Sequence, residues 1–241
     1  LEIAAALTAL AWFRRSRGDE VGTRELFAEA LAIVRAERGE SHPHTLSLRS
    51  NPASMLPETA ERIREHQEIL ALRRAKLGET HYSVANSWSA LGRAHLDAGD
   101  AATAADAFAA AHSIWLATDG AANPMALAAE RNLAQALERK GDRGAAERAW
   151  AQLAVDLEGA RASPRTLAGY RVDLALHALA TERPAAAEDE ADKAIALLAA
   201  ASEPPNTLLG RAQAVRGRAL VAQGRLEEGG ALLAVALAAL D

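Results

Sequence analysis

The feature that most constrains the fold is a unit that the sequence repeats about six times, most clearly over residues 85–115. In this unit Trp88, Leu91 and His95 stand at positions i, i+3 and i+7, which places them on one stripe of a helix. Gly92 lies next to this stripe and has no side chain, so a second helix can approach closely there. The pattern predicts a first helix with one packing face.

A second helix is predicted after a very short turn. Gly99 can adopt the left-handed conformation that ends a helix, and Asp100 can accept hydrogen bonds from the free N–H groups of the next helix. Ala104, Phe108 and Ala111 then recur at i, i+4 and i+7, so a large ring stands between two small residues. The unit therefore predicts an antiparallel helix hairpin, which must bury its second apolar face against a neighbouring copy.

Copies of the turn set the period of the repeat. Gly18-Asp19 and Gly141-Asp142 match it, whereas the fifth copy carries Glu182-Arg183-Pro184 instead. Because the turns recur about every 42 residues, more than the ~34 of the commonest helical repeats, we expect longer second helices and a longer loop between repeats than in a 34-residue unit. We expect one continuous array, with repeats near residues 1–42, 43–81, 82–123, 124–164, 165–205 and 206–241.

The spacing of Trp88, Leu91, Gly92 and the residues that follow resembles the tetratricopeptide repeat, with His95 in place of the usual tyrosine. The segments Gly39-Glu-Ser-His-Pro43 and Gly78-Glu-Thr-His-Tyr82 resemble the connections of the kinesin-light-chain-like subclass. This resemblance implies an all-α, right-handed superhelical solenoid of about six antiparallel hairpins. It also implies a bacterial regulatory context, in which such arrays accompany Ser/Thr kinase or signal-transducing ATPase modules.

The second repeat departs from the pattern because it contains two prolines. Pro52 stands where a leucine would pack, and Pro57 follows one turn later. Since a proline inside a helix costs about 3 kcal/mol, we expect the first helix to stop near Asn51 and a second helix to run from Pro57 to about Lys76. The break is either drift in a tolerant array or a change in local curvature.

No signature of catalysis or of cofactor binding is present. The sequence lacks the nucleophile-elbow, phosphate-loop, zinc-protease and dinucleotide-binding motifs, and it has no cysteine to act as a nucleophile or thiolate ligand. His42 and His44 stand close together around Pro43, but a metal site needs more ligands than these. We therefore expect a protein that is not an enzyme and binds neither cofactor nor metal.

The charges are divided by helix type. The expected first helices carry 13 basic and 6 acidic residues, whereas the expected second helices carry 13 and 21, in a chain whose net charge is −5. In the family that the sequence resembles, first helices line a concave groove, so the resemblance implies a relatively basic groove. Positions that resemble its groove-facing ones are Trp12, Arg15, Asn86, Ser89, Arg93, Arg131, Asn132, Gln135, Arg139, Asp173, Arg211 and Arg218.

Arginine and asparagine suit peptide recognition, since arginine can bind a carboxylate with two hydrogen bonds and asparagine can pair with a peptide backbone. We expect a scaffold or sensor that binds a protein or peptide in this groove, and the arginines favour an acidic one. The alternative is an autoregulatory segment whose ligand is its own attached kinase or ATPase module. Nucleic acid is a poorer partner, because the chain is acidic and the basic face lacks interleaved aromatic residues. The sequence opens on Leu1 inside a helical pattern and has no apolar run of membrane-spanning length, so we expect a cytoplasmic segment of a larger protein.

The last helix is unusual because residues 229–240 contain no charge. We expect Leu226, Leu233, Leu237 and Leu240 to pack against the preceding helix, and Leu232 and Val235 to point elsewhere. An end helix of a solenoid normally presents a polar outer face. We therefore expect the outer side to be covered, by later residues of a longer chain or by self-association. The other possibility is an exposed patch of small alanines.

Overall fold

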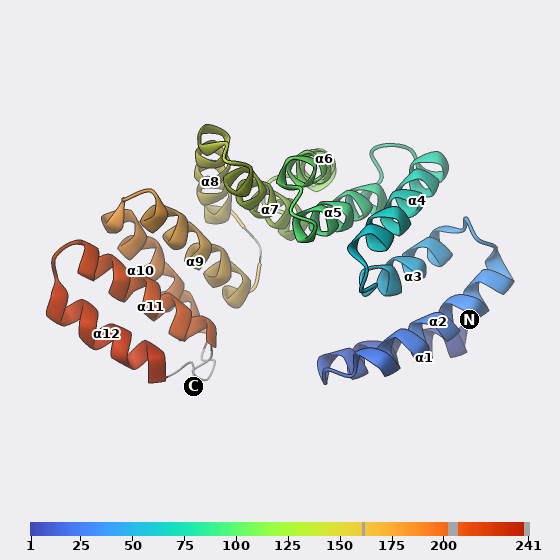
Figure 1. Cartoon of the computed structure of the whole chain (residues 1–241), viewed down its shortest axis with the longest axis horizontal. Coiled ribbons are helices and arrows are strands. Elements are labelled where there is room, and N and C mark those ends of the chain that lie inside the picture. Colours follow the sequence, from blue (N-terminus) through green and yellow to red (C-terminus); the bar gives the residue numbers. More distant parts are fainter. Residues whose placement is uncertain (161, 202–206, 239–241) are drawn as a thin grey trace. The chain divides into compact units, whose positions relative to one another are not determined.

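The computed structural model describes residues 1–160, 162–201 and 207–238, which form twelve α-helices and no strand (Figure 1). The helices are α1 Glu2–Ser16, α2 Glu20–Arg38, α3 Pro43–Ala53, α4 Thr59–Leu77, α5 Tyr82–Asp97, α6 Ala101–Asp119, α7 Pro124–Lys140, α8 Arg143–Glu158, α9 Pro164–Ala180, α10 Pro184–Ala200, α11 Thr207–Ala222 and α12 Leu226–Ala238. In the part of the chain that is described, no helix is both long enough and apolar enough to span a membrane.

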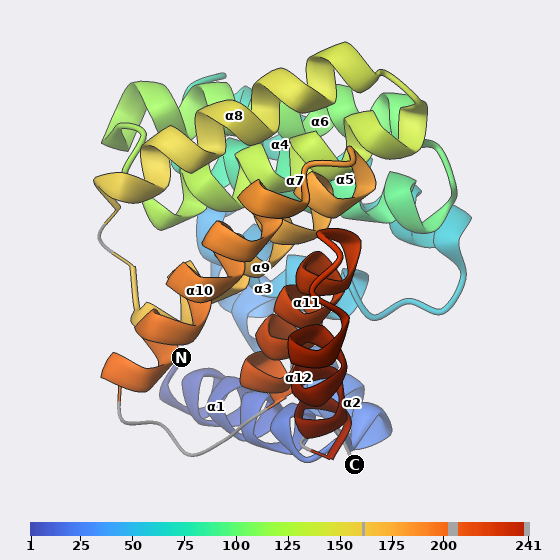
Figure 2. The same ribbon diagram turned by 90° about the vertical axis from the view of Figure 1, so that its left-hand side faces the viewer.

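The chain divides into two compact units. The first holds residues 1–120 and 128–146, and the second holds residues 121–127 and those from 147 onwards. In the first unit α1 and α2, α3 and α4, and α5 and α6 form hairpins, and α2 packs on α3 and α4 on α5. In the second unit α9 and α10, and α11 and α12, form hairpins, and α10 and α9 both contact α11 (Figure 2). Helix hairpins stacked on hairpins therefore make up each unit.

The predicted turn within a hairpin is confirmed. Gly99 has a φ of +80°, and Asp100 accepts a 3.1 Å hydrogen bond from the backbone N–H of Thr103. Asp19 and Asp142 accept equivalent bonds at the start of α2 and α8. In the fifth hairpin, the non-glycine residue Glu182 takes the left-handed position, with a φ of +56°.

The close approach expected at Gly92 is also confirmed. A Cβ atom added there would stand only 2.8 Å from the ring of Phe108, so the ring of α6 lies directly on the backbone of α5. Phe108 is fully buried in a cluster with Ala104, Ala105 and Ala136. The glycine and the ring thus fix how closely the two helices of the third hairpin pack.

Two successive connections between hairpins have the same local structure. Gly39 and Gly78 end α2 and α4 with φ of +83° and +82°. Three residues later, His42 and His81 begin α3 and α5, and the Nδ1 atom of each accepts a 3.1 Å hydrogen bond from a backbone N–H. These histidines therefore cap helices. In the described residues no group of three or more His, Asp or Glu side chains could hold a metal ion.

The break in the second repeat is confirmed, although its ends differ from those predicted. Helix α3 continues to Ala53, so Pro52 lies in its last turn, where the Ser54 N–H still reaches the Ser50 carbonyl at 3.3 Å. Helix α4 begins at Thr59 rather than Pro57 and ends at Leu77. Near a helix end a proline leaves few carbonyls unpaired, so the last turn of α3 tolerates it.

In the first three hairpins the second helix is longer than the first. There α2, α4 and α6 have 19 residues each, against 15, 11 and 16 for their partners. In the later hairpins α8 has 16 residues against 17 for α7, and α9 and α10 have 17 each.

The register predicted for the last helix was right for Leu233, which packs against Gly217 of α11, and wrong for Leu226 and Leu237. Leu226 and Leu237 are exposed, whereas Gly229 and Ala236 are buried. The cause is a tertiary contact, since a Cβ atom on Gly229 would stand 2.8 Å from the carbonyl oxygen of Gly217 in α11. Because of this contact, the face of α12 that contains Gly229 and Ala236 packs against α11. Val235 is exposed as expected, and Leu240 lies outside the described residues.

Candidate protein-binding surface

The predicted groove residues of α1 contact one another. Trp12 is 45% exposed and meets the buried ring of Phe27 edge-on, with the centroids 5.3 Å apart. The Arg15 guanidinium lies 5.2 Å from the centre of the indole. The outer face of α1 therefore presents an aromatic ring with a cation stacked over it.

Helix α5 presents two of its three predicted residues to solvent. Asn86 and Arg93 are exposed, whereas Ser89 is buried and its hydroxyl accepts a 3.0 Å hydrogen bond from Arg93. Many protein atoms surround the Arg93 guanidinium, and this partial desolvation lowers its pKa. Ser89 therefore positions Arg93 and does not itself form part of an open surface.

Helix α7 presents a mixed polar face. Arg131, Asn132 and Gln135 are half-buried, and Arg139 is exposed. Arg131 already interacts with another group of the chain. The first unit thus contains the predicted residues of α1, α5 and α7.

The remaining predicted residues belong to the second unit. Arg211 and Arg218 of α11 are exposed, as a binding face requires. Asp173 of α9 is 9% exposed and has a partner within the chain, so it lies below the surface. Each unit therefore carries its own set of candidate binding residues.

Sequence reasoning missed a set of polar residues in α4, although an internal comparison reveals them. Counted back from the glycines that end α2 and α6, the residue at −12 is Phe27 or Phe108, but in α4 it is His66. The residue at −5 is Val34 or Trp115, but in α4 it is Arg73. Similarly, Thr23 or Ala104 at −16 is replaced by Arg62. The second hairpin has basic groups at three positions where its neighbours have core residues.

Arg73 is a buried cation with neutral partners. It is 4% exposed and donates hydrogen bonds to the carbonyl oxygens of Leu46 and Ser83, both at 3.1 Å, and to the Ser87 hydroxyl at 2.7 Å. Burial lowers the pKa of its guanidinium. Arg73 therefore joins α3, α4 and α5 without a carboxylate to balance its charge.

His66 is a second buried basic group. It is 1% exposed, and its Nε2 atom lies 3.3 Å from the Ser54 hydroxyl at the end of α3. Burial, together with the positive charges of Arg93, Arg73 and Arg62, lowers the pKa of His66 to about 4. The imidazole is therefore neutral at pH 7.

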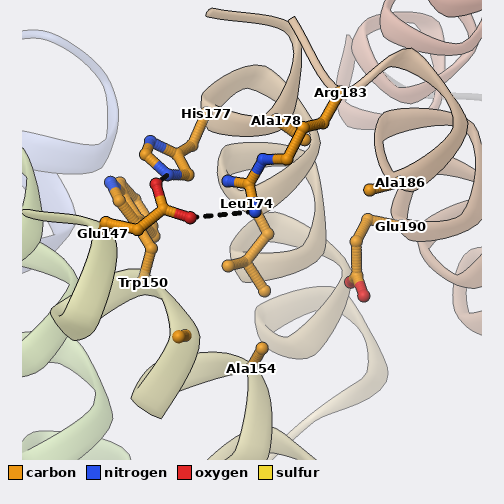
Figure 3. A pocket seen from close by; sticks show the side chains of 10 residues that line it. Glu147, Trp150, Ala154, Leu174, His177, Ala178, Arg183, Ala186 and Glu190 are labelled. Atoms are coloured by element: carbon orange, nitrogen blue, oxygen red, sulfur yellow. Dashed lines mark hydrogen bonds and ion pairs between the residues drawn. The ribbon is translucent and has the colours of Figure 1, made fainter. Parts of the chain in front are cut away.

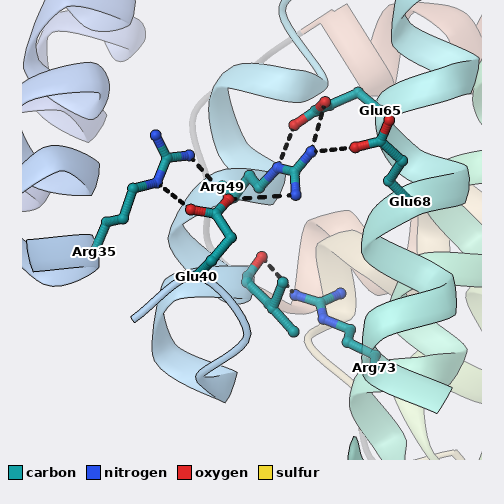
Figure 4. Close-up of polar contacts among 7 residues, drawn as sticks. Arg35, Glu40, Arg49, Glu65, Glu68 and Arg73 are labelled. Carbon is teal, nitrogen blue, oxygen red and sulfur yellow. Dashed lines mark hydrogen bonds and ion pairs between the residues drawn. The ribbon is translucent and has the colours of Figure 1, made fainter. Parts of the chain in front are cut away.

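A network of balanced charges lies in the same hairpin (Figure 4). The Arg49 guanidinium in α3 binds Glu65 at 2.9 Å and Glu68 at 2.7 Å, both from α4, and lies 3.5 Å from Glu40. These carboxylates raise the pKa of Arg49, and Arg49 in turn lowers that of Glu65. In the second hairpin, Arg49 is thus paired with carboxylates, whereas Arg73 bonds only to neutral groups.

The second unit contains a small cavity of about 160 Å³ between α8, α9 and α10 (Figure 3). Trp150 and His177 stack at its edge with centroids 5.4 Å apart. Glu147 binds His177 at 3.0 Å and Arg183 at 2.9 Å. A volume of this size holds one side chain rather than a cofactor, and its charged groups are already paired.

Comparison with solved structures shows the same fold in proteins of low sequence identity. Over 91% of this chain and 89% of the other, it is similar to BtubC (BKLC) from P. vanneervenii, with a TM-score of 0.74 and 13% identity. It is similar to a putative kinesin light chain with TPR-like repeats from Podosopora anserina over 98% of this chain and 93% of the other, with a TM-score of 0.53 and 18% identity.

A third similar structure is a STAND ATPase with a tetratricopeptide-repeat sensor, PH0952 from Pyrococcus horikoshii. The match covers 98% of this chain and 36% of that protein, with a TM-score of 0.73 and 13% identity. No family model and no curated protein matches the sequence. From the helix hairpins, their glycine turns and these structural matches together, the chain has the fold of the tetratricopeptide-repeat proteins.

Proposed function

We propose that this chain is a scaffold or sensor segment that binds a polypeptide through the polar faces of its first helices and catalyses no reaction. The observation that carries this proposal is the state of Arg93 and Arg139. Both are exposed, and within the described residues neither has a carboxylate at ion-pair distance. Such cations are available to bind a carboxylate of a partner with two hydrogen bonds.

Context supports the proposal without naming a partner. In the STAND protein, the tetratricopeptide repeats are described as the sensor. We propose that this chain likewise forms part of a larger bacterial regulatory protein, in which its six hairpins make a single array. Its ligand is a peptide or protein segment with acidic groups, because the first helices carry more basic than acidic residues.

The test of binding uses charge reversal on α5 and α7. Losing one charged hydrogen bond costs about 1.5 to 3 kcal/mol, so Arg131→Ala should weaken binding of captured partners roughly tenfold or more. Binding should also weaken as salt is raised. If a variant with Arg93, Arg131 and Arg139 all changed to Glu still captures every partner of the parent with equal affinity, these faces are not the binding surface.

The single array has its own test. In a linear array each repeat contacts only its neighbours, so Trp150→Ala, which costs about 3 to 5 kcal/mol in a packed site, should speed hydrogen exchange in the hairpins around α8 before α1 or α12. Equal acceleration in all twelve helices would contradict an array.

A second candidate function is autoregulation of an attached enzyme module. It is favoured by the structural match to a multidomain ATPase of which this chain corresponds to only 36%. If the longer protein contains a kinase or nucleotide-binding module, removing residues 1–241 should raise its basal turnover. If the deletion leaves the basal turnover unchanged, autoregulation is ruled out and only the scaffold proposal remains.

A further inference from the structure

The second hairpin and α5 bring together positive charges that the chain does not balance. In α4, Arg62, His66 and Arg73 stand at positions where α2 and α6 have core residues. Arg93 of α5 lies near enough to His66 to lower its pKa. Asp97 is the one carboxylate that pairs with this group among the described residues, through a 3.2 Å contact with Arg62. The cluster therefore carries a net positive charge in a partly desolvated place.

Several donors and acceptors of this cluster have no partner. The Nε atom of Arg62 is buried and makes no hydrogen bond, and the same holds for Nδ1 of His66. Unpaired buried polar groups are rare in folded proteins, and each one asks for an explanation such as a missing ligand. With Nε of Arg73, three such atoms lie on α4, and those of Arg62 and His66 are one turn apart.

The bonding of His66 can be worked out from Ser54. The Ser54 hydroxyl lies 3.0 Å from the carbonyl oxygen of Ser50, which can only accept, so the single hydroxyl proton is used there. His66 Nε2 must then donate to Ser54 Oγ at 3.3 Å, which leaves Nδ1 as an unprotonated nitrogen. A negative charge placed near it would favour its protonation, so His66 would respond to an anion bound beside it.

The early end of α3 is part of the same arrangement. Helix α3 has 11 residues, whereas the other first helices of the first unit, α1 and α5, have 15 and 16. In α5 the residue that matches Ser54 is Arg93, since both stand 12 residues after the capping histidine, His42 or His81. At the end of α3, next to His66, the small side chain of Ser54 therefore stands at the position that a long arginine occupies in α5.

We propose that Arg62 of α4 and Arg93 of α5, beside the end of α3, form a binding site for a carboxylate of an acidic polypeptide segment. This inference rests on the proposed function and moves its main anchor from α5 and α7 to α4 and α5. Arg93 presents an exposed guanidinium held by Ser89. Arg62 supplies a second guanidinium that is 18% exposed, and its Nη2 atom lies 3.2 Å from both Asp97 and the Thr59 hydroxyl. Two guanidinium groups suit a planar carboxylate, which each can bind with paired hydrogen bonds.

Asp97 acts as an internal competitor for this site. Its side chain is 59% exposed and takes the position of a ligand carboxylate on Arg62. It is also the carboxylate whose charge acts on Arg93. An incoming acidic segment therefore displaces Asp97 from Arg62, and the strength of the internal pair sets how acidic a ligand must be to bind.

A polypeptide fits the cluster better than a nucleic acid does. No aromatic side chain belongs to the cluster, so bases would have nothing to stack on. The basic charge is confined to a few groups, which suits one or two carboxylates.

The experiment measures binding of a fluorescein-labelled octaglutamate peptide by anisotropy at low salt, with octaglutamine and an eight-nucleotide oligo-dT as comparisons. Octaglutamate should bind and octaglutamine should not. Arg93→Gln should weaken octaglutamate binding by about tenfold and Arg62→Gln by several-fold, as expected for loss of charged hydrogen bonds. Asp97→Asn should strengthen it, whereas Arg64→Gln, an exposed arginine of α4, should leave it unchanged.

An NMR titration of the His66 ring in the parent protein gives a second readout. Bound octaglutamate should raise the pKa of His66, and the rise should disappear in Arg93→Gln. The inference is overturned if octaglutamate fails to bind, if Asp97→Asn weakens binding, or if oligo-dT binds more tightly with the same dependence on Arg62 and Arg93. Binding that responds to Arg131→Gln and Arg139→Gln but not to Arg62→Gln or Arg93→Gln would overturn this inference and leave the proposed function standing.

Discussion

The guanidinium of Arg73 in α4 donates a 2.7 Å hydrogen bond to the hydroxyl of Ser87 in α5. The same group also holds the carbonyl oxygens of Leu46 in α3 and Ser83 in α5. A residue that stands where other repeats have Val34 or Trp115 thus replaces apolar packing with hydrogen bonds to two neighbouring helices. The hairpin is stabilised by these bonds, but it also carries the cost of a buried charge.

Truncating Arg73 should destabilise the first unit strongly. Arg73→Ala removes three hydrogen bonds together with the buried side chain that makes them, which should cost about 3 kcal/mol or more. Arg64→Ala on the exposed side of α4 should cost less than about 0.5 kcal/mol. Urea denaturation followed by circular dichroism compares the two, and equal midpoints would show that the Arg73 bonds do not contribute to stability.

Acid should destabilise the protein through His66. The pKa of this residue is about 4 in the folded protein against 6.5 for an ordinary histidine, so between these values the unfolded chain binds a proton that the folded chain does not. Stability from the neutral ring is complete above pH 6.5 and is lost as the pH falls towards 4, by up to about 3 kcal/mol.

The matched variant is His66→Phe, which restores the residue type of Phe27 and Phe108. It should lose less stability than the parent between pH 7 and pH 4.5 in urea titrations. If both proteins lose stability in parallel, groups other than His66 cause the acid sensitivity.

Adding one methyl group at Gly92 should loosen the third hairpin. The new Cβ of Gly92→Ala would meet the Phe108 ring at 2.8 Å, and overpacking of this kind costs about 1 to 3 kcal/mol. Gly169→Ala in α9 is the control, because nothing lies within 4 Å of its added Cβ. That change should stabilise the protein by about 0.5 to 1 kcal/mol. Thermal melts of opposite sign would support the packing argument, and a neutral Gly92→Ala would refute it.

The left-handed Glu182 offers a stabilising substitution. Its φ of +56° costs a side-chain-bearing residue about 1 to 2 kcal/mol, so Glu182→Gly should raise stability by up to about 1 kcal/mol once the extra freedom of the unfolded chain is counted. Gly141→Ala, at a φ of +84° in the equivalent turn, should lower stability instead. A Glu182→Gly protein that melts below the parent would mean that the glutamate side chain has a role of its own.

Local features were predictable because their causes are local. The turn at Gly99 and Asp100 follows from the freedom of a glycine and the reach of an aspartate, and both are visible in the sequence. The close contact between Gly92 and Phe108 was predictable for a related reason, since only a residue without a side chain allows a ring so near.

Features that depend on tertiary contacts were not predictable in the same way. The register of α12 depends on the contact between Gly217 and Gly229, two residues in different helices, so helical spacing alone placed Leu226 and Leu237 wrongly. Counting charges by helix type assumed that charged side chains face solvent, which fails for the buried Arg73. For the candidate site, the exposure of Arg93 agrees with the prediction, whereas Ser89 and Asp173 are buried.

The two matching connections after α2 and α4 also have a meaning for how such a chain can change its length. Each joins a glycine of nearly the same φ to a histidine cap three residues later, and each carries an arginine paired with the glutamate after the glycine, at 3.1 Å for Arg35 and 2.7 Å for Arg74. The two connections therefore have equivalent residues on each side of the point where a deletion or duplication would join the chain. An in-frame loss or duplication of residues 43–81 would therefore leave a connection with the same glycine, glutamate and capping histidine. The second hairpin can thus be deleted or duplicated during evolution without changes to the connections on either side of it.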